Sequence, residues 1–534
     1  MRFRSKLSAF FLFLAAIFAS FVVCPAQAPA VPAGRVVLVL PFENRSGNPT
    51  LNWIGDSFPD TLDRRLNSAG FLTISHDDRT FAYDHLGLPK DFRPSRATTI
   101  QIARQLDANF VIVGNFTVAN NHIAVQARAL SVDDLRLSPP VDDSADLPRL
   151  FDAENAIAWK VARSIDPHFT VAESTFVAAP GAVPLPAFED YIRGSDAATP
   201  AERLQRLKAA VGVSPDYASA LLALGKEQYA ERNFADAATT LSKVPPNNPI
   251  ALEAGFFLGL ARFNSANYAG AESAFHFVAD RLPLPEVVND EGVALSRQGK
   301  DAAALFQRAT AADPSDEDFH YNLALAFFRR GDTTNALNEV ATALKLRPND
   351  NEALELQRQL KSAAPGSKLP ATDAAGFGPV ERVRRTYSET SYRQAAFQLA
   401  QLRSARMAML PPAQQATEFS ALGRDAINQG LMPEAESNFQ SAIAADPRSA
   451  AAHAGLAEVR ERSNDPKDAR AEAVISLRLQ PNAPALLVLA RLDVAQNALG
   501  VAADEVSQAL QLEPQNTAAL ALKQTLQSRG QVVR

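Results

Sequence analysis

The chain has one cysteine in 534 residues, Cys24, so an intrachain disulfide is excluded. It also lacks the patterns of common active sites: a glycine-rich phosphate loop followed by Lys-Ser or Lys-Thr, a paired-histidine metal motif, and a serine in a nucleophile elbow. Its seven histidines are scattered, and the one group close to acidic residues, His76 with Asp77, Asp78 and His85, has no histidine pair at i, i+4. The sequence therefore predicts no enzymatic activity, no metal site and no cofactor.

Strong net charge and later apolar runs of membrane-spanning length are absent as well. The formal net charge of −6 gives no overall attraction to nucleic acid. The apolar run at residues 7–23 follows three basic residues and precedes a stretch of small residues, which is typical of a secretory signal. We therefore predict a signal peptide at residues 1–26, cleaved near Ala26 or Ala30, and an exported protein of the periplasm or cell envelope. A lipid anchor at Cys24 is disfavoured because the residue before it is not small, whereas an uncleaved anchor stays an alternative.

Prolines recur at a fixed spacing over the rest of the chain. Pro215, Pro249 and Pro283 are 34 residues apart, and two later pairs repeat that interval. A period of about 34 residues is typical of helix pairs stacked into a solenoid, in which proline ends the second helix of each pair. The unit between Pro283 and Pro314 is three residues shorter, so we expect an irregular superhelix there.

Apolar and small residues fall at matching positions in each unit. In one unit Leu258 and Gly259 are followed by Ala271, Phe275 and Pro283, and this pattern resembles the tetratricopeptide repeat family. The resemblance implies an all-α superhelical solenoid that binds other proteins. The predicted parts are a first block at 185–361, a linker at 362–378, and a second block at 379–529 in which helix resumes after Pro379 and a capping helix occupies 517–529.

Residues 35–168 alternate apolar runs with helical periodicity, which indicates a small α/β domain. The sequence LPFEN at residues 40–44, with Ser46, Gly47 and the pair Gly55-Asp56, resembles the N-terminal domain of the TolB family. We therefore predict a multidomain protein, a TolB-N-like α/β (α+β) domain followed by the two repeat blocks. Strands are expected at 36–40, 71–74, 110–113 and 123–127, a helix at 147–164, and an acidic loop at 135–148.

Candidate binding residues lie on the first helices of the repeats, because these helices line the concave surface of such solenoids. The groove is predicted to be mainly apolar and to hold a protein or peptide partner, with charged residues selecting polar flanks. Its predicted residues are Leu222, Lys226, Tyr229, Glu253, Phe256, Leu260, Phe263, Asp318, Tyr321, Leu325, Phe328 and Arg329. Alternatively, the aromatic residues close the superhelix or receive the chain's own linker at 178–186. Asn322 is the only groove residue of the type that grips a terminal carboxylate, so such a ligand is disfavoured.

Two further features have alternative interpretations. Asn44, Ser46 and Gly47 form either an anion-holding nest after the first strand or a plain turn. The arginine-rich stretch at residues 381–409 is either a solvated face or a contact for an acidic partner.

The function predicted from these patterns is a non-catalytic adaptor or scaffold of the cell envelope that binds a protein or peptide partner. The alternative is a ligand sensor or enzyme in the N-terminal α/β domain, with the repeats as a recruiting arm. The sequence leaves the oligomeric state open.

Overall fold

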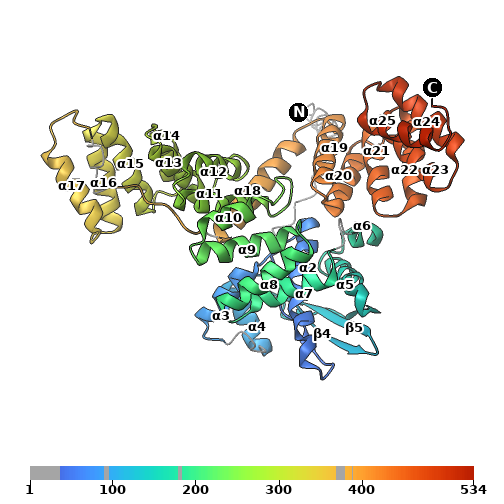
Figure 1. Ribbon diagram of the computed structural model, residues 1–534, viewed down its shortest axis with the longest axis horizontal. Coiled ribbons are helices and arrows are strands. Elements are labelled where there is room, and N and C mark those ends of the chain that lie inside the picture. Colours follow the sequence, from blue (N-terminus) through green and yellow to red (C-terminus); the bar gives the residue numbers. More distant parts are fainter. Residues whose placement is uncertain (1–35, 89–94, 179–182, 369–378, 388, 534) are drawn as a thin grey trace, which may run out of the picture.

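The computed structural model describes residues 36–88, 95–178, 183–368, 379–387 and 389–533. The predicted signal peptide lies outside these residues, as does most of the predicted linker at 362–378. The described chain forms an α/β domain and two helical arrays, which extend to opposite sides above the α/β domain in the view of Figure 1. None of its described helices combines the length and hydropathy that crossing a bilayer requires.

The α/β domain contains a mixed sheet in the order β3-β1-β4-β5-β6, with β2 paired to β4 and β7 paired to β5. The pairs that β1 makes with β3 and β4 are parallel, and those that β5 makes with β4, β6 and β7 are antiparallel. The strands are β1 (Val36–Val39), β2 (Glu43–Asn44), β3 (Leu72–Thr73), β4 (Phe110–Ala119), β5 (His122–Ser131), β6 (Arg136–Leu137) and β7 (Val141–Asp146).

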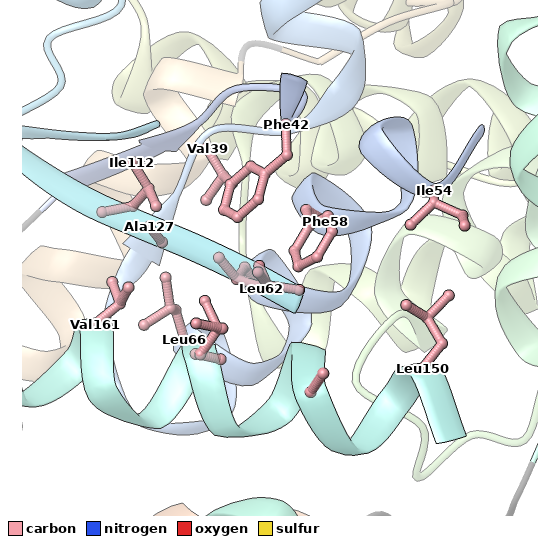
Figure 2. Close-up of a cluster of buried hydrophobic side chains, with 14 of the residues drawn as sticks. Val39, Phe42, Ile54, Phe58, Leu62, Leu66, Ile112, Ala127, Leu150 and Val161 are labelled. Carbon is pink, nitrogen blue, oxygen red and sulfur yellow. The ribbon is translucent and has the colours of Figure 1, made fainter. Parts of the chain in front are cut away.

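Helices cover both faces of this sheet because β1 is apolar on both sides, as its unbroken apolar sequence predicts. Val37 and Val39 face α2 (Asn52–Ser68) and α5 (Leu150–Ile165), whose apolar stripes complete the larger core. Figure 2 shows Phe42, Phe58, Leu62 and Leu66 gathered between these helices and the strands. Leu38 and Leu40 face the opposite way, toward α3 (His76–His85) and α4 (Arg96–Gln105).

The acidic stretch after residue 140 is a strand, so the predicted loop at 135–148 is wrong. β7 pairs with β5 from Val141 to Asp146, and its residues alternate between half-buried and exposed. Lys160 on α5 pairs with the half-buried Asp143 and donates to the carbonyl of Asp142 at 2.7 Å. An edge strand with one solvated face accommodates this acidic sequence, and such strands have little apolar content for a pattern search to detect.

The first array consists of antiparallel helix pairs, as the proline spacing predicts. Its pairs are α7 (Leu185–Asp196) with α8 (Pro200–Val213), α9 (Ala218–Ala230) with α10 (Phe234–Leu241), α11 (Ala251–Asn264) with α12 (Tyr268–Arg281), α13 (Pro285–Arg297) with α14 (Ala303–Ala312), and α15 (Glu317–Arg330) with α16 (Thr333–Leu346), followed by α17 (Asn351–Ser362). In the unit predicted to be irregular, α14 has 10 residues where α12 and α16 have 14.

The second array follows α18 (Glu389–Ala408). Its pairs are α19 (Pro412–Asn428) with α20 (Met432–Ala445), α21 (Ala450–Arg462) with α22 (Pro466–Leu479), and α23 (Ala483–Ala495) with α24 (Leu499–Leu512), followed by α25 (Thr517–Ser528). Helix was predicted to resume after Pro379, but residues 379–387 are not helical and α18 begins at Glu389.

Glycine allows the helices of a pair to approach closely. A Cβ atom on Gly225 would lie 2.4 Å from Cγ of Leu241, and one on Gly259 would lie 2.5 Å from Cε1 of Phe275. Both distances are shorter than any Cβ contact tolerates, so these positions need glycine or a shift of the partner helix.

The three parts pack against one another. Phe188 and Ile192 of α7 join the core of the α/β domain, and the Tyr191 hydroxyl donates to Asp60 on α2 at 2.7 Å. The second array contacts the segment that follows α5, where the amide of Ala172 donates to Glu436 on α20 at 3.1 Å. The α/β domain therefore anchors both arrays.

Candidate functional site

A non-helical segment of the chain, residues 381–387, lies on the first helices of the first array. We call it the groove segment, and the surface formed by α11, α13, α15 and α17 the groove face. Glu381 contacts Ser296 and Arg329 near the C-terminal ends of α13 and α15, whereas Arg384 contacts Asp316 at the N-terminus of α15. The groove segment therefore runs opposite to α15.

Two asparagines hold the main chain of the groove segment. Asn322 is fully buried; its Oδ1 accepts the amide of Arg382 and its Nδ2 donates to the carbonyl of the same residue, both at 2.8 Å. Asn289 donates to that carbonyl at 3.1 Å, and Asp290 accepts the amide of Arg384 at 2.8 Å. These bonds recognise peptide groups and not side chains, so they hold a polypeptide whatever its sequence.

Carboxylates surround the Arg382 side chain. Its guanidinium lies 2.8 Å from Asp318, 2.6 Å from Asp350 and 2.8 Å from Glu352, and its Cζ lies 3.9 Å from the centre of the Tyr321 ring. Burial lowers the pKa of Arg382, but the bonds to the three carboxylates outweigh burial and hold it above its ordinary value. The same arginine holds the pKa of Asp350 below its ordinary value although burial opposes this. The site is therefore matched to a guanidinium.

Arg384 occupies a second acidic position. Its guanidinium pairs with Asp316 and lies 3.3 Å from Asp318, and its side chain is 28% exposed. Asp316 also caps α15, since it accepts the amides of Asp318 and Phe319, and Asp350 caps α17 in the same way. Each of these two carboxylates thus caps the N-terminus of a helix and also binds an arginine of the groove segment.

Glu381 has the opposite surroundings. Its side chain is completely buried; it pairs with Arg329, lies 3.5 Å from Arg297, and accepts the Ser296 hydroxyl at 2.5 Å. Burial and the neighbouring Arg297 lower the pKa of Arg329. A carboxylate between the two guanidiniums offsets their repulsion, so this end of the groove face is matched to an acidic residue.

Apolar contacts complete the seat of the groove segment. Val383 packs against two apolar clusters of the array, one that spans α11 to α15 and one that spans α13 to α17. The Tyr387 ring meets Phe256 edge to face, with centroids 5.1 Å apart. The groove segment therefore presents in turn an acidic, a basic, an aliphatic and a basic side chain, and after two exposed residues an aromatic one.

The structure separates the predicted groove residues into three groups. Phe256, Asp318, Tyr321 and Arg329 contact the groove segment. Lys226 and Glu253 pair with each other at 2.8 Å, and Lys226 also pairs with Asp77 of the α/β domain at 2.5 Å. The others pack within the array: Leu222, Leu260, Leu325 and Phe328 in its core, and Tyr229 and Phe263 against Phe234 and Tyr268. Whether these residues bind a partner stays a prediction.

Sequence reasoning predicted Asp318 but missed the other carboxylates of the site. Asp316 and Asp350 precede helices, where aspartate is common as a cap, so their sequence context indicates no ligand. The polar residues that contact the groove segment but were not predicted are Asn289, Asp290, Ser296, Arg297, Asp316, Asp350 and Glu352. The groove segment itself was interpreted as the start of the second block, and the own-chain alternative named residues 178–186 instead.

The predicted anion nest is a hydrogen-bonded turn. The amide of Ser46 donates to Oδ1 of Asn44 at 2.9 Å, and the Ser46 hydroxyl accepts the amide of Val118 at 2.8 Å. Gly47 has a φ of +69°, which glycine adopts without strain. An anion at this turn stays a prediction. Within the described residues no group of three or more His, Cys, Asp or Glu side chains is arranged to hold a metal ion.

Similarity to known proteins was found in the chain's sequence and in its fold. The curated protein "Penicillin-binding protein activator LpoB" of Enterobacter sp. (strain 638) is 35% identical over 107 residues, which are 20% of this chain and 49% of that protein. The "Putative adenylate cyclase 3" of Rhizobium meliloti (strain 1021) is 28% identical over 102 residues, which are 19% of this chain and 16% of that protein. The chain thus spans about half of one relative and less of the other.

Among solved structures, MamA of Desulfovibrio magneticus RS-1 aligns with a TM-score of 0.30 and 18% identity, over 32% of this chain and 99% of that one. The tetratricopeptide repeat family matches residues 290–351 and 420–484, one stretch in each helical array. Both arrays of this chain therefore contain tetratricopeptide repeats.

Proposed function

We propose that this chain is an exported, non-catalytic adaptor of the cell envelope that binds a protein partner on the groove face of its first array. The observation that carries the proposal is the set of contacts by which the groove face holds the groove segment. Asn289, Asp290 and Asn322 bond to its main chain, and Asp318 and Asp350 bind its arginine side chain. A surface that holds one polypeptide segment in this way has the groups needed to hold another.

The envelope location is supported by two observations. The N-terminal residues have the pattern of a secretory signal. A relative that is 35% identical over part of its length is named an activator of a penicillin-binding protein. In our proposal the α/β domain, which resembles the TolB N-terminal domain in its sequence motifs, anchors the arrays and sets their positions.

A structural role for the most buried carboxyl group of the α/β domain supports the non-catalytic assignment. Burial raises the pKa of Glu154 to about 7, against the effect of hydrogen bonds from Ser57 and Thr61. The Ser57 hydroxyl donates to one Glu154 oxygen at 2.5 Å and the Thr61 hydroxyl to the other at 2.7 Å. These two hydrogen bonds tie α5 to α2. Because the Glu154 side chain has no exposed surface, it is out of reach of a substrate.

Site-specific photo-crosslinking in the native cell envelope tests this function. The photoreactive residue p-benzoylphenylalanine is introduced at position 352, where the Glu352 side chain is 65% exposed at the edge of the groove face. A matched control places it at position 346, where Leu346 is 41% exposed on the second helix of a pair. We expect a crosslink to a second polypeptide from position 352 and not from position 346. Equal yields from both positions, or crosslinks within the chain alone, would contradict an adaptor role for this face.

A further inference from the structure

The groove face is occupied by the protein's own chain. The charges of the groove face are opposite to those of the groove segment at each charged residue that it contacts. Carboxylates of α15, α17 and their caps surround Arg382 and Arg384, whereas the guanidiniums of Arg297 and Arg329 flank Glu381. Exchanging the acidic and basic residues of the segment would place like charges together at all three positions. The groove face therefore selects for the order of charges, in addition to the main chain that the asparagines hold.

The contacts of the groove segment are those of a bound peptide and not of a sealed core. Its main chain bonds to side chains of the array, with no strand or helix pairing among the described residues. Arg385 and Thr386 are exposed, and Arg384 is partly exposed. Charged pairs that reach solvent weaken as salt is added, so competing ions reach the Arg384 contacts, whereas the Glu381 side chain at the other end of the segment is completely buried.

The groove segment is tethered to the surface that it occupies, since α17 ends at Ser362 and α18 begins at Glu389. A short tether gives an effective concentration in the millimolar range, so a free peptide with the same contacts competes poorly while the tethered segment is intact. Weakening the tethered segment alone removes this competition and leaves the groove face unchanged. The difference between the two situations is measurable.

We propose that the groove face is the binding site for a partner segment of defined chemistry, and that the groove segment closes this site in cis until such a partner displaces it. The partner segment has an acidic residue, two arginines separated by one aliphatic residue, and an aromatic residue three positions after the second arginine, the order found in residues 381–387. This proposal rests on the proposed adaptor function and names the chemistry of its partner.

Fluorescence anisotropy with a labelled synthetic peptide of residues 379–387 tests the proposal on the purified full-length protein. The titrated proteins are the wild type, an opened variant with Arg382→Ala and Arg384→Ala, and the opened variant with Asn322→Ala added. We expect the opened variant to bind the peptide at least tenfold more tightly than the wild type, because the cis competitor is weakened. The added Asn322→Ala substitution reverses the gain, and a control peptide with both arginines replaced by glutamate does not bind.

Two measurements keep the result decisive. Circular dichroism reports whether the opened variant folds. If it does not, Tyr387→Ser, which removes the ring contact with Phe256, replaces it and is expected to raise the affinity about threefold. Light scattering reports whether an opened chain pairs with a second copy. The proposal is overturned if the peptide binds no opened variant, if Asn322→Ala leaves its binding unchanged, or if opened chains form dimers that exclude it. Because no native partner is needed, these outcomes are independent of the crosslinking result.

Discussion

The Asn322→Ala substitution should loosen the groove segment while leaving the arrays folded. Asn322 forms three hydrogen bonds of 2.8 Å: one accepted from the Arg382 amide, one donated to the Arg382 carbonyl and one donated to Oδ1 of Asn289. The third bond lies within the groove face and does not hold the segment. Two bonds are therefore lost between the segment and the array.

The magnitude follows from these two bonds. A neutral hydrogen bond contributes about 1 kcal/mol, so closure of the segment loses about 2 kcal/mol. This corresponds to a roughly 30-fold smaller closing constant, because about 1.4 kcal/mol is a factor of ten. The Arg382 carbonyl keeps its bond from Asn289, and the ion pairs of the Arg382 side chain persist, so the segment is loosened and not expelled.

Hydrogen exchange measured by mass spectrometry gives the direct readout. Protection of amides in residues 380–387 should fall about 30-fold, in line with the closing constant, and protection in β4 and β5 should not change. Asn338→Ala, an exposed substitution on α16, serves as the matched control. We call the pair of hydrogen bonds from Asn322 to the main chain of Arg382 the clamp. An unchanged exchange rate in residues 380–387 would refute the clamp, and an equal loss of protection throughout the first array would show that Asn322 stabilises the array instead.

Three further predictions concern stability. Because burial raises the pKa of Glu154 to about 7 from 4.5, the protonated side chain stabilises the fold at low pH, and this stability is lost as the pH rises through 7. The free energy of unfolding in urea should therefore fall by about 3 kcal/mol between pH 5 and 8 in the wild type, and this fall should be absent in Glu154→Gln. The hydrogen bond to Glu339 raises the pKa of His320, and Nε2 of His320 lies 3.1 Å from the carbonyl oxygen of Pro314, so both ring nitrogens donate when the ring is protonated. His320→Gln should therefore lower the thermal midpoint of unfolding at pH 6 and have less effect at pH 9. An equal effect at both pH values would contradict this. Gly455→Ala would place a Cβ atom 2.2 Å from two ring atoms of Phe439, so we expect a loss of about 1–3 kcal/mol that Phe439→Leu relieves, and additive effects of the two substitutions in a double-mutant cycle would contradict the contact.

The repeats and most of the α/β domain are predictable from sequence because their signals are local and periodic. The 34-residue proline spacing reflects helix length and turn, and the apolar run of β1 reflects burial on both faces of a sheet. The strand β7 was not predicted because apolar and polar residues alternate only weakly from Val141 to Asp146, and because the sequence is rich in aspartate, which strands disfavour. Its position is set by pairing with β5, a contact that no local pattern encodes.

The candidate site was predicted in part, for a related reason. Aromatic and charged residues at the first-helix positions indicated the groove face, and four of them contact the groove segment. The segment itself lies about 30–130 residues later in the chain than the side chains that hold it, for example 60 residues after Asn322. Its arginines were interpreted as either a solvated face or a contact for an acidic partner, and only the fold brings the carboxylates of the first array to them.

The two arrays share a scaffold but differ at the clamp, which separates recognition from stability. His320 and His453 are each the fourth residue of their helix, and each faces a glutamate at 2.6 Å and a proline carbonyl. The sixth residue, however, is the clamp Asn322 in α15 and Gly455 in α21. Since Phe439 fills the space beside Gly455, an asparagine there has no room to turn toward a peptide. The scaffold therefore does not require the clamp, and peptide recognition of the kind proposed belongs to the first array, with the second array of the same chain as its internal control.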